Sequence, residues 1–142
     1  MDSEGTAWAA GFFDGEGSVN ITQNQHSRTG KFYHVLCVDV AQVDPRPLMY
    51  LKERWDGCIR TRQPSTANAR LSCMWSLRNK AAEDFLRDIH PWVRVKGEQI
   101  EIAFAFRETF RARGGSTPLA DGVLESRIAM KQKLENDRRL PS

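Results

Sequence analysis

Cysteine is scarce in this 142-residue sequence, which has three cysteines and no C-x-x-C pair. The odd number and wide spacing of Cys37, Cys58 and Cys73 argue against a disulfide framework and against a zinc site. A long apolar run is also lacking, as is a basic-then-apolar leader, so neither membrane insertion nor secretion is expected. These absences favour an intracellular protein of the cytoplasm or of an organellar matrix, with no membrane partner.

Net charge is small, +3 in total, but the charges are distributed unevenly. The first 17 residues carry four acidic side chains and neither lysine nor arginine. Residues 18–78 carry nine lysines and arginines against four acidic side chains. The middle of the chain is therefore the candidate surface for a polyanion such as a nucleic acid. Length and composition fit one globular domain over residues 1–142.

The stretch 8–17 (WAAGFFDGEG) combines an apolar run with Gly11 and Gly15, four residues apart. It predicts a short helix that is buried on most sides, and the glycines give it a bare backbone stripe suited to close contact with another helix. Asp14 and Glu16 stand at its C-terminal end, where the helix dipole disfavours negative charge. We therefore expect a cationic group there. The stretch by itself is compatible both with a metal site and with ordinary turn residues.

Alternating apolar and polar residues predict two hairpins downstream, each with one apolar face and one open face. The helices between them are predicted from apolar residues at helical spacing and from capping and breaking residues. The expected elements are a helix over 6–14 capped by Ser3 or Thr6, strands near 18–22 and 31–40, a helix between Asp44-Pro45 and Asp56-Gly57, strands over 58–62 and 70–78, a helix over 79–89 capped by Asn79, a helix over 97–112 and a last helix within 116–139. This order predicts an α+β fold in which the hairpins are halves of one sheet.

The tryptophans and histidines are expected to have structural rather than catalytic roles. Three tryptophans are expected to pack in or against the core: Trp55, Trp75 and Trp92. The histidines lack a metal-binding spacing and are expected at the surface or at helix ends: His26, His34 and His90.

Residues 9–17 resemble, position for position, the nine-residue motif of the LAGLIDADG homing endonucleases, with Ala9 in place of the usual leucine. Residues 79–111, with the turn His-Pro-Trp-Val-Arg-Val-Lys before a helix start at Glu98, resemble the C-terminal part of that family. The likeness covers a core of about residues 6–112, with the helix within 116–139 beyond it. It implies a homing endonuclease-like fold, in which a four-stranded antiparallel sheet forms a DNA-binding saddle.

The number of motif copies implies an assembly state. Family members with one copy are homodimers, and this sequence has one copy. The resemblance therefore implies a two-fold homodimer, whose motif helices pack against each other in a self-complementary contact. The residues expected at that interface are Ala10, Gly11, Asp14 and Gly15.

The resemblance also implies a metal site at the end of the motif helix. By resemblance, Glu16 corresponds to the carboxylate that binds the catalytic divalent cation, Mg²⁺ or another such as Mn²⁺, and the Gly15 carbonyl is expected as a further ligand. Such a cation neutralises charge on the phosphate and activates water. The remaining catalytic positions by resemblance are Gln42, Arg46 and Lys96, which would order water and stabilise developing charge. Asp14, the first acid of the motif, is expected to brace the helix.

DNA contacts are expected on the open strand faces, because arginine and asparagine bond base edges bidentately and a β-ribbon fits the major groove. Arg28 and Lys31, in the first hairpin loop, are expected to touch phosphate. The expected base-reading residues are Asn20, Thr22, Asn24, Tyr33, Asp39, Arg60, Arg62, Arg70 and Ser72.

The function implied is that of a site-specific double-strand DNA endonuclease associated with intron or intein mobility. It would act as a homodimer on a long, near-palindromic site by metal-dependent phosphodiester hydrolysis. The alternative on the same fold is a non-cleaving DNA-binding regulator or an RNA intron maturase. A third alternative is a small-molecule-binding or purely structural dimer, in which the basic charge of the central hairpins would have no role.

Overall fold

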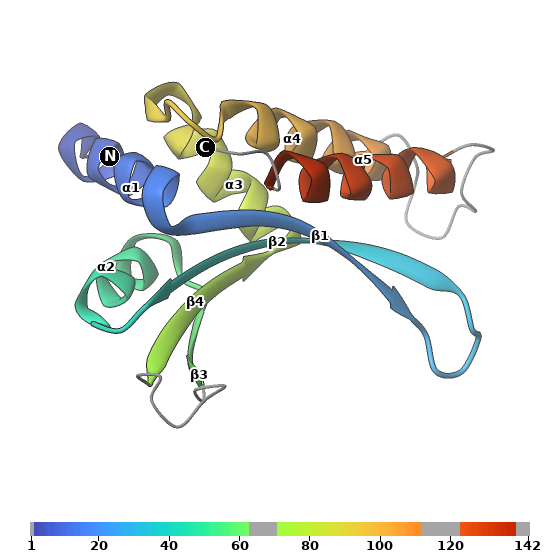
Figure 1. The fold of residues 1–142 in the computed structure, drawn as a ribbon, viewed down its shortest axis with the longest axis horizontal. Coiled ribbons are helices and arrows are strands. Elements are labelled where there is room, and N and C mark those ends of the chain that lie inside the picture. Colours follow the sequence, from blue (N-terminus) through green and yellow to red (C-terminus); the bar gives the residue numbers. More distant parts are fainter. Residues whose placement is uncertain (1, 63–70, 112–122, 139–142) are drawn as a thin grey trace.

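One antiparallel sheet organises the chain, and helices lie over one of its faces (Figure 1). The computed structural model describes residues 2–62, 71–111 and 123–138. The elements are α1 (Ser3–Glu16), β1 (Gly17–Gln25), β2 (Phe32–Gln42), α2 (Arg46–Trp55), β3 (Cys58–Arg62), β4 (Ser72–Arg78), α3 (Asn79–Ile89), a 3₁₀ turn η1 (His90–Trp92), α4 (Gly97–Arg111) and α5 (Val123–Arg138). Across these residues, no helix combines the length and apolar character needed to cross a membrane.

The two hairpins join into one four-stranded sheet of order β1-β2-β4-β3, which confirms the predicted α+β class. The inner strands β2 and β4 are antiparallel, with Val38 opposite Leu77 and Gln42 opposite Cys73. Helices α3, α4 and α5 lie over one face, and the hairpins curve away from them, so the opposite face is concave (Figure 1). The alternation of the strands therefore separates a core face from an open face.

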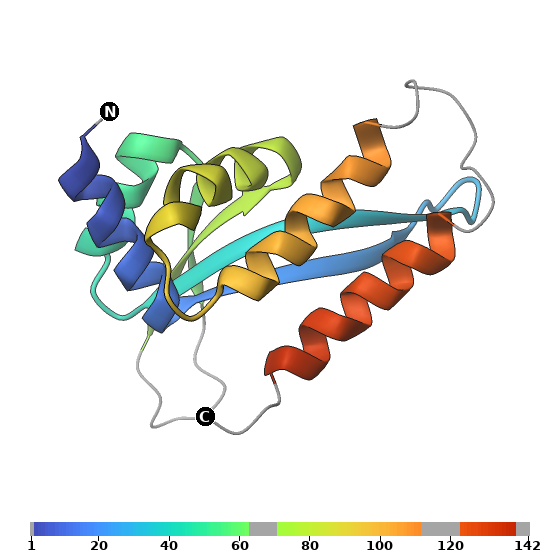
Figure 2. The same ribbon diagram turned by 90° about the horizontal axis from the view of Figure 1, so that it is seen from above.

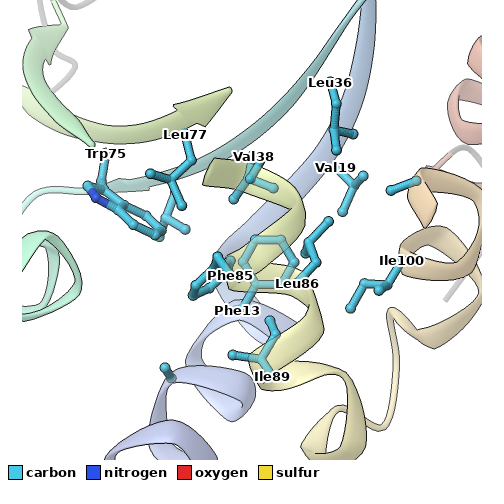
Figure 3. Packing of buried hydrophobic residues seen from close by; sticks show 14 of the residues in the cluster. Phe13, Val19, Leu36, Val38, Trp75, Leu77, Phe85, Leu86, Ile89 and Ile100 are labelled. Carbon is cyan, nitrogen blue, oxygen red and sulfur yellow. The ribbon is translucent and has the colours of Figure 1, made fainter. Parts of the chain in front are cut away.

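Aromatic packing around Phe85 of α3 joins the helices to the sheet (Figure 3). The Phe85 ring meets Phe13 of α1 edge-to-face with centroids 5.5 Å apart, and it meets Trp75 of β4 at 5.1 Å. All three side chains are buried, and each contributes about 1.5–3 kcal/mol on transfer from water. The buried face of the motif helix is thus fixed to the same cluster that fixes β4.

Helix capping differs from the prediction at two helices. Asp2, rather than Ser3 or Thr6, caps α1: its carboxylate accepts a hydrogen bond from the Glu4 amide. Asn79 does not cap α3 either. Its backbone has a φ of 52°, which asparagine tolerates, and its side-chain oxygen accepts from the Leu36 amide on β2. In both cases a local pattern indicated the helix start correctly to within a turn. The Asp2 cap is itself a local contact, whereas a long-range contact with β2 decides the role of the Asn79 side chain.

The tryptophan and histidine predictions hold in part. Trp75 is buried and Trp55 packs against the core, but the core prediction is wrong for Trp92, which is 47% exposed. The surface prediction is wrong for His34, which is buried on β2 with no hydrogen-bond partner for either ring nitrogen among the described residues. Burial lowers the pKa of His34, and the charges of Arg127 and Lys131 on α5 lower it further.

Helix α5 lies beside α4 and along the edge strand β1 (Figure 2). Its Leu134 is buried, and its Arg127 guanidinium lies 3.8 Å from the centroid of the Phe110 ring on α4. Arg127 Nε also donates to the Thr109 hydroxyl at 2.8 Å. The last helix is therefore part of the packed core. Of the predicted range 116–139, residues 123–138 are described.

Candidate metal centre and nucleic-acid interface

Helix α1 ends at Glu16 and passes directly into β1. Gly17 caps the helix with an extended backbone, and its amide donates to the Phe13 carbonyl. A side chain at position 17 would collide with the Phe13 ring, so only glycine permits this close turn. The turn leaves Glu16 exposed at the junction between the motif helix and the sheet.

Asp14 binds the segment that precedes α4. Its two carboxylate oxygens accept hydrogen bonds from the backbone amides of Arg94 at 2.7 Å, Val95 at 3.2 Å and Lys96 at 3.1 Å. A carboxylate that accepts several backbone N–H groups fixes the conformation of that backbone. Asp14 therefore braces the helix against residues 80 to 82 positions away, in keeping with the expected structural role.

Lys96 is the cation at the C-terminal end of α1. Its ammonium group donates to the Asp14 carbonyl oxygen at 2.7 Å, which satisfies an acceptor that the helix leaves without a partner. Burial lowers the pKa of Lys96, whereas the negative charges of Asp14 and Glu16 act in the opposite direction. The unfavourable charge arrangement noted in the sequence is thus partly offset within the chain.

The carboxylate of Glu16 and the carbonyl of Gly15 are oxygen atoms of the kind that suit a hard divalent cation. Among the described residues, none donates a hydrogen bond to the Glu16 carboxylate, and the Gly15 carbonyl lies in the last turn of the helix. Carboxylate and carbonyl oxygens are the ligands that Mg²⁺ prefers. The described part of the chain contains no group of three acidic, histidine or cysteine side chains placed to hold a metal. The oxygen atoms at this end of α1 are those of the Glu16 carboxylate and the Gly15 carbonyl.

Gln42 and Arg46 lie on either side of the turn between β2 and α2. The register that pairs Gly17 with Val40 places Gln42, two residues further on, at the sheet end where α1 joins β1. Arg46 is largely exposed, and its guanidinium is paired with Asp44 at 2.5 Å. That pairing lowers the pKa of Asp44 to about 2. The structure thus groups Lys96 with Asp14 and Glu16, whereas Arg46 is engaged by Asp44.

The concave face of the sheet carries most of the predicted DNA-contacting residues. The strand registers place Asn20 opposite Cys37, Asp39 opposite Ser76, and Arg60 opposite Met74, all on this face. Asp39 accepts a 2.5 Å hydrogen bond from the Ser76 hydroxyl. The predicted residues that lie on this face are Asn20, Thr22, Asn24, Tyr33, Asp39, Arg60, Arg62 and Ser72. Arg70 lies outside the described residues.

Arg28 and Lys31 are exposed in the turn that joins β1 to β2. The turn is held by a hydrogen bond from the Gln25 side chain to the Gly30 carbonyl at 2.7 Å, and by a tilted ring contact between His26 and Tyr33. The two cations therefore lie at the end of a long arm, away from the sheet centre (Figure 1).

Arg78 was not among the predicted DNA-contacting residues, although it lies on the same face. It alternates with buried Leu77 and stands opposite Cys37 on β2. The period-two pattern that placed Ser72 on the open face extends to position 78 and could have identified it.

Gly11 and Gly15 leave an open stripe along α1. A Cβ built at either position meets no atom within 4 Å. Ala10 differs, because it is fully buried in the chain's own core and has no surface to offer an interface. Asp14 is likewise occupied by its own chain. Of the four residues predicted at the dimer interface, the two glycines lie on the open side of the helix.

Solved structures of homing endonucleases share this architecture. The archaeal intron-encoded homing endonuclease I-Vdi141I, solved in complex with DNA, superposes with a TM-score of 0.78 at 15% identity, covering 100% of this chain and 89% of that one. For I-CvuI, solved with a DNA target and Mg, the TM-score is 0.75 at 15% identity, covering 96% of this chain and 83% of that one. The LAGLIDADG homing endonuclease I-GzeII, solved in complex with its DNA target, superposes with a TM-score of 0.69 at 18% identity, covering 89% of this chain and 43% of that one. No protein-family model and no curated protein matches the chain.

Proposed function

We propose that this chain, whose fold is that of the LAGLIDADG homing endonucleases, is a divalent-metal-dependent, site-specific endonuclease that cuts double-stranded DNA as a homodimer. The observation that carries the proposal is the position of Glu16. It is exposed at the junction of the motif helix and the concave sheet face, beside a lysine that Asp14 holds in place. This arrangement brings an oxygen ligand for a cation to the edge of a polar surface that suits a polyanion.

Glu16 and the Gly15 carbonyl would hold the cation. When bound, Mg²⁺ neutralises charge on the phosphate and makes a water molecule more acidic. The Lys96 side chain, which donates to the Asp14 carbonyl, is placed beside these oxygens to stabilise the charge that develops on the phosphate. Gln42, an uncharged amide at the same end of the sheet, can orient water without adding charge.

One observation supports a homodimer. The open stripe at Gly11 and Gly15 allows the backbone of a second copy of α1 to approach closely. A two-fold pair would bring two copies of Glu16 and two sheets onto one DNA molecule.

The proposal is tested by incubating the protein with a randomised duplex library and Mg²⁺ and sequencing the cut ends. We expect double-strand cuts at a recurrent, near-palindromic sequence, and no cuts when the metal is chelated. Recurrent binding without cutting would instead favour a non-cleaving DNA-binding protein. Cutting without sequence preference would contradict site specificity, and the absence of both binding and cutting would contradict the whole proposal.

A further inference from the structure

Arg78 lies where three hollows on the concave sheet face meet. One hollow is lined by Arg78 together with Asn20 and Asp39, and it extends past the edge strand β1 to Lys131 and Glu135 of α5. A second is lined by Arg78 with Cys58 and Ser76. A third runs from Arg78 toward Tyr33 at the far end of the sheet. Its side chain is therefore accessible from several directions on the surface that we propose to lie on DNA.

The strand registers explain this central position. Arg78 is the last residue of β4, an inner strand, and it stands opposite Cys37 of β2, which in turn stands opposite Asn20 of β1. On the other side of β4, Trp75 and Leu77 are buried in the core. The backbone of β4 is thus fixed by its core face, and the Arg78 side chain must project from the open face.

The guanidinium of Arg78 retains most of its donors. Its Nη1 donates to the Cys37 sulfur at 2.6 Å, and a thiol is a weak acceptor. Among the described residues, no carboxylate forms an ion pair with Arg78. Two acids line the first hollow with Arg78: Asp39, which is hydrogen-bonded to the Ser76 hydroxyl, and Glu135 of α5, which is paired with Lys131. Within the described part of the chain, a planar donor fork is therefore held over the sheet centre without an ion-pair partner.

Two acceptors fit such a fork, the paired O6 and N7 atoms of guanine and the oxygens of a phosphate. Position favours the base. A ribbon that lies in the major groove presents its central side chains to base edges, whereas phosphates flank the groove. Arg28 and Lys31, at the end of the hairpin arm, are placed for phosphate, but Arg78 lies on an inner strand.

We infer that Arg78 is a specificity-determining residue that recognises one guanine in each half-site of the DNA target. The inference rests on the proposed function, since it requires the concave face to bind DNA. Cys37 acts as a positioning residue, because its sulfur holds one end of the guanidinium.

The test is a binding selection from the randomised duplex library for the wild type, Arg78→Ala, Arg78→Lys and the control Lys31→Ala. We expect the wild type to require guanine at one symmetric pair of positions. Arg78→Ala should lose the preference at that pair alone and bind the wild-type site about 5- to 150-fold more weakly. Arg78→Lys keeps the charge but not the fork, so it should lose most of the preference. Lys31→Ala should weaken binding to all sequences alike.

Three results would overturn the inference while leaving the proposed function standing. The wild type could select a site that lacks a required guanine. Arg78→Ala could keep every base preference, or it could weaken binding equally at all sequences, which is the behaviour of a phosphate contact. A wild type that selects no sequence would overturn both proposals. Selection without cutting would contradict only the nuclease activity. Because Arg78 is exposed, its variants are expected to fold, and circular dichroism checks this.

Discussion

Asp14 and Lys96 hold each other by two hydrogen bonds that run in opposite directions. The Asp14 carboxylate accepts from the Lys96 backbone amide at 3.1 Å, and the Lys96 ammonium donates to the Asp14 carbonyl oxygen at 2.7 Å. The pair joins the end of the motif helix to the segment before α4, and so fixes a cation beside Glu16. Its position depends on contacts between residues that are far apart in the sequence.

Replacing Asp14 by asparagine tests this link. The amide removes the negative charge that holds three backbone N–H groups, so the loop and Lys96 should shift relative to Glu16. We expect the cleavage rate to fall about 100-fold, since a misplacement of about 1 Å has that effect in catalytic sites. Single-turnover cleavage of the selected site measures it. The exposed control Asp84→Asn should leave the rate unchanged. An unaltered rate in Asp14→Asn would contradict the bracing role.

The pH dependence of cleavage should report Lys96. Burial lowers its pKa below the usual value of 10.5, so the cleavage rate should fall as pH rises through that lowered pKa, where Lys96 loses its charge. In the same pH window the unfolded chain binds the proton more tightly, so the contribution of Lys96 to stability rises with pH and unfolding does not explain the loss. The Lys96→Arg variant stays charged and should retain its activity to higher pH. If the cleavage rates of the two proteins fell with rising pH along the same curve, a charged Lys96 would not take part in the reaction.

Gly11→Leu tests the dimer interface. Because a Cβ at position 11 meets no atom of the chain, the substitution should preserve the fold of the protomer. It should prevent close approach of two α1 helices, convert the dimer to a monomer in analytical ultracentrifugation and abolish double-strand cutting. Ala105→Leu, at an exposed position of α4, is the matched control and should remain dimeric. If the Gly11→Leu protein stayed dimeric, the dimer interface could not lie at the Gly11 and Gly15 stripe.

Glu83 should be important for stability. Its side chain is 0% exposed, and its oxygens accept from Arg87 Nη2 at 2.7 Å and from Arg107 Nε at 3.1 Å. Glu83→Gln removes the charge that compensates these guanidinium groups, of which Arg107 is itself mostly buried. We expect a loss of about 3–5 kcal/mol in the free energy of unfolding by urea. Asp84→Asn breaks an exposed pair and should cost less than about 1 kcal/mol. Equal stability of the two variants would rule out the buried network as a major stabilising element.

The sequence predicted the elements well because their signals are local. Alternation over residues 72–78 and the apolar spacing of 79–89 each depend on side chains within one element. The roles of single polar residues were harder to predict. Asn79 bonds β2 instead of capping its helix, and His34 is buried on the face that α3, α4 and α5 cover. Neither contact leaves a pattern in the neighbouring sequence.

The candidate site shows the same division. The motif identified Glu16 and predicted a cation near it, but only the fold shows that Asp14 binds the Lys96 amide. Conversely, the burial of Ala10 follows from how α1 sits on α3 and the sheet, which a nine-residue motif does not record. The sequence motif therefore located the end of α1, whereas tertiary packing determines which side of that helix is accessible.

The central claim is that Glu16 serves a metal-dependent cleavage reaction and is not needed to hold the complex together. The most direct measurement is the single-turnover cleavage rate of Glu16→Gln on the selected duplex with Mg²⁺, alongside its binding affinity for that duplex. We expect cleavage to fall below detection while the affinity stays within about threefold of the wild type. Cleavage at the wild-type rate by Glu16→Gln would contradict the claim.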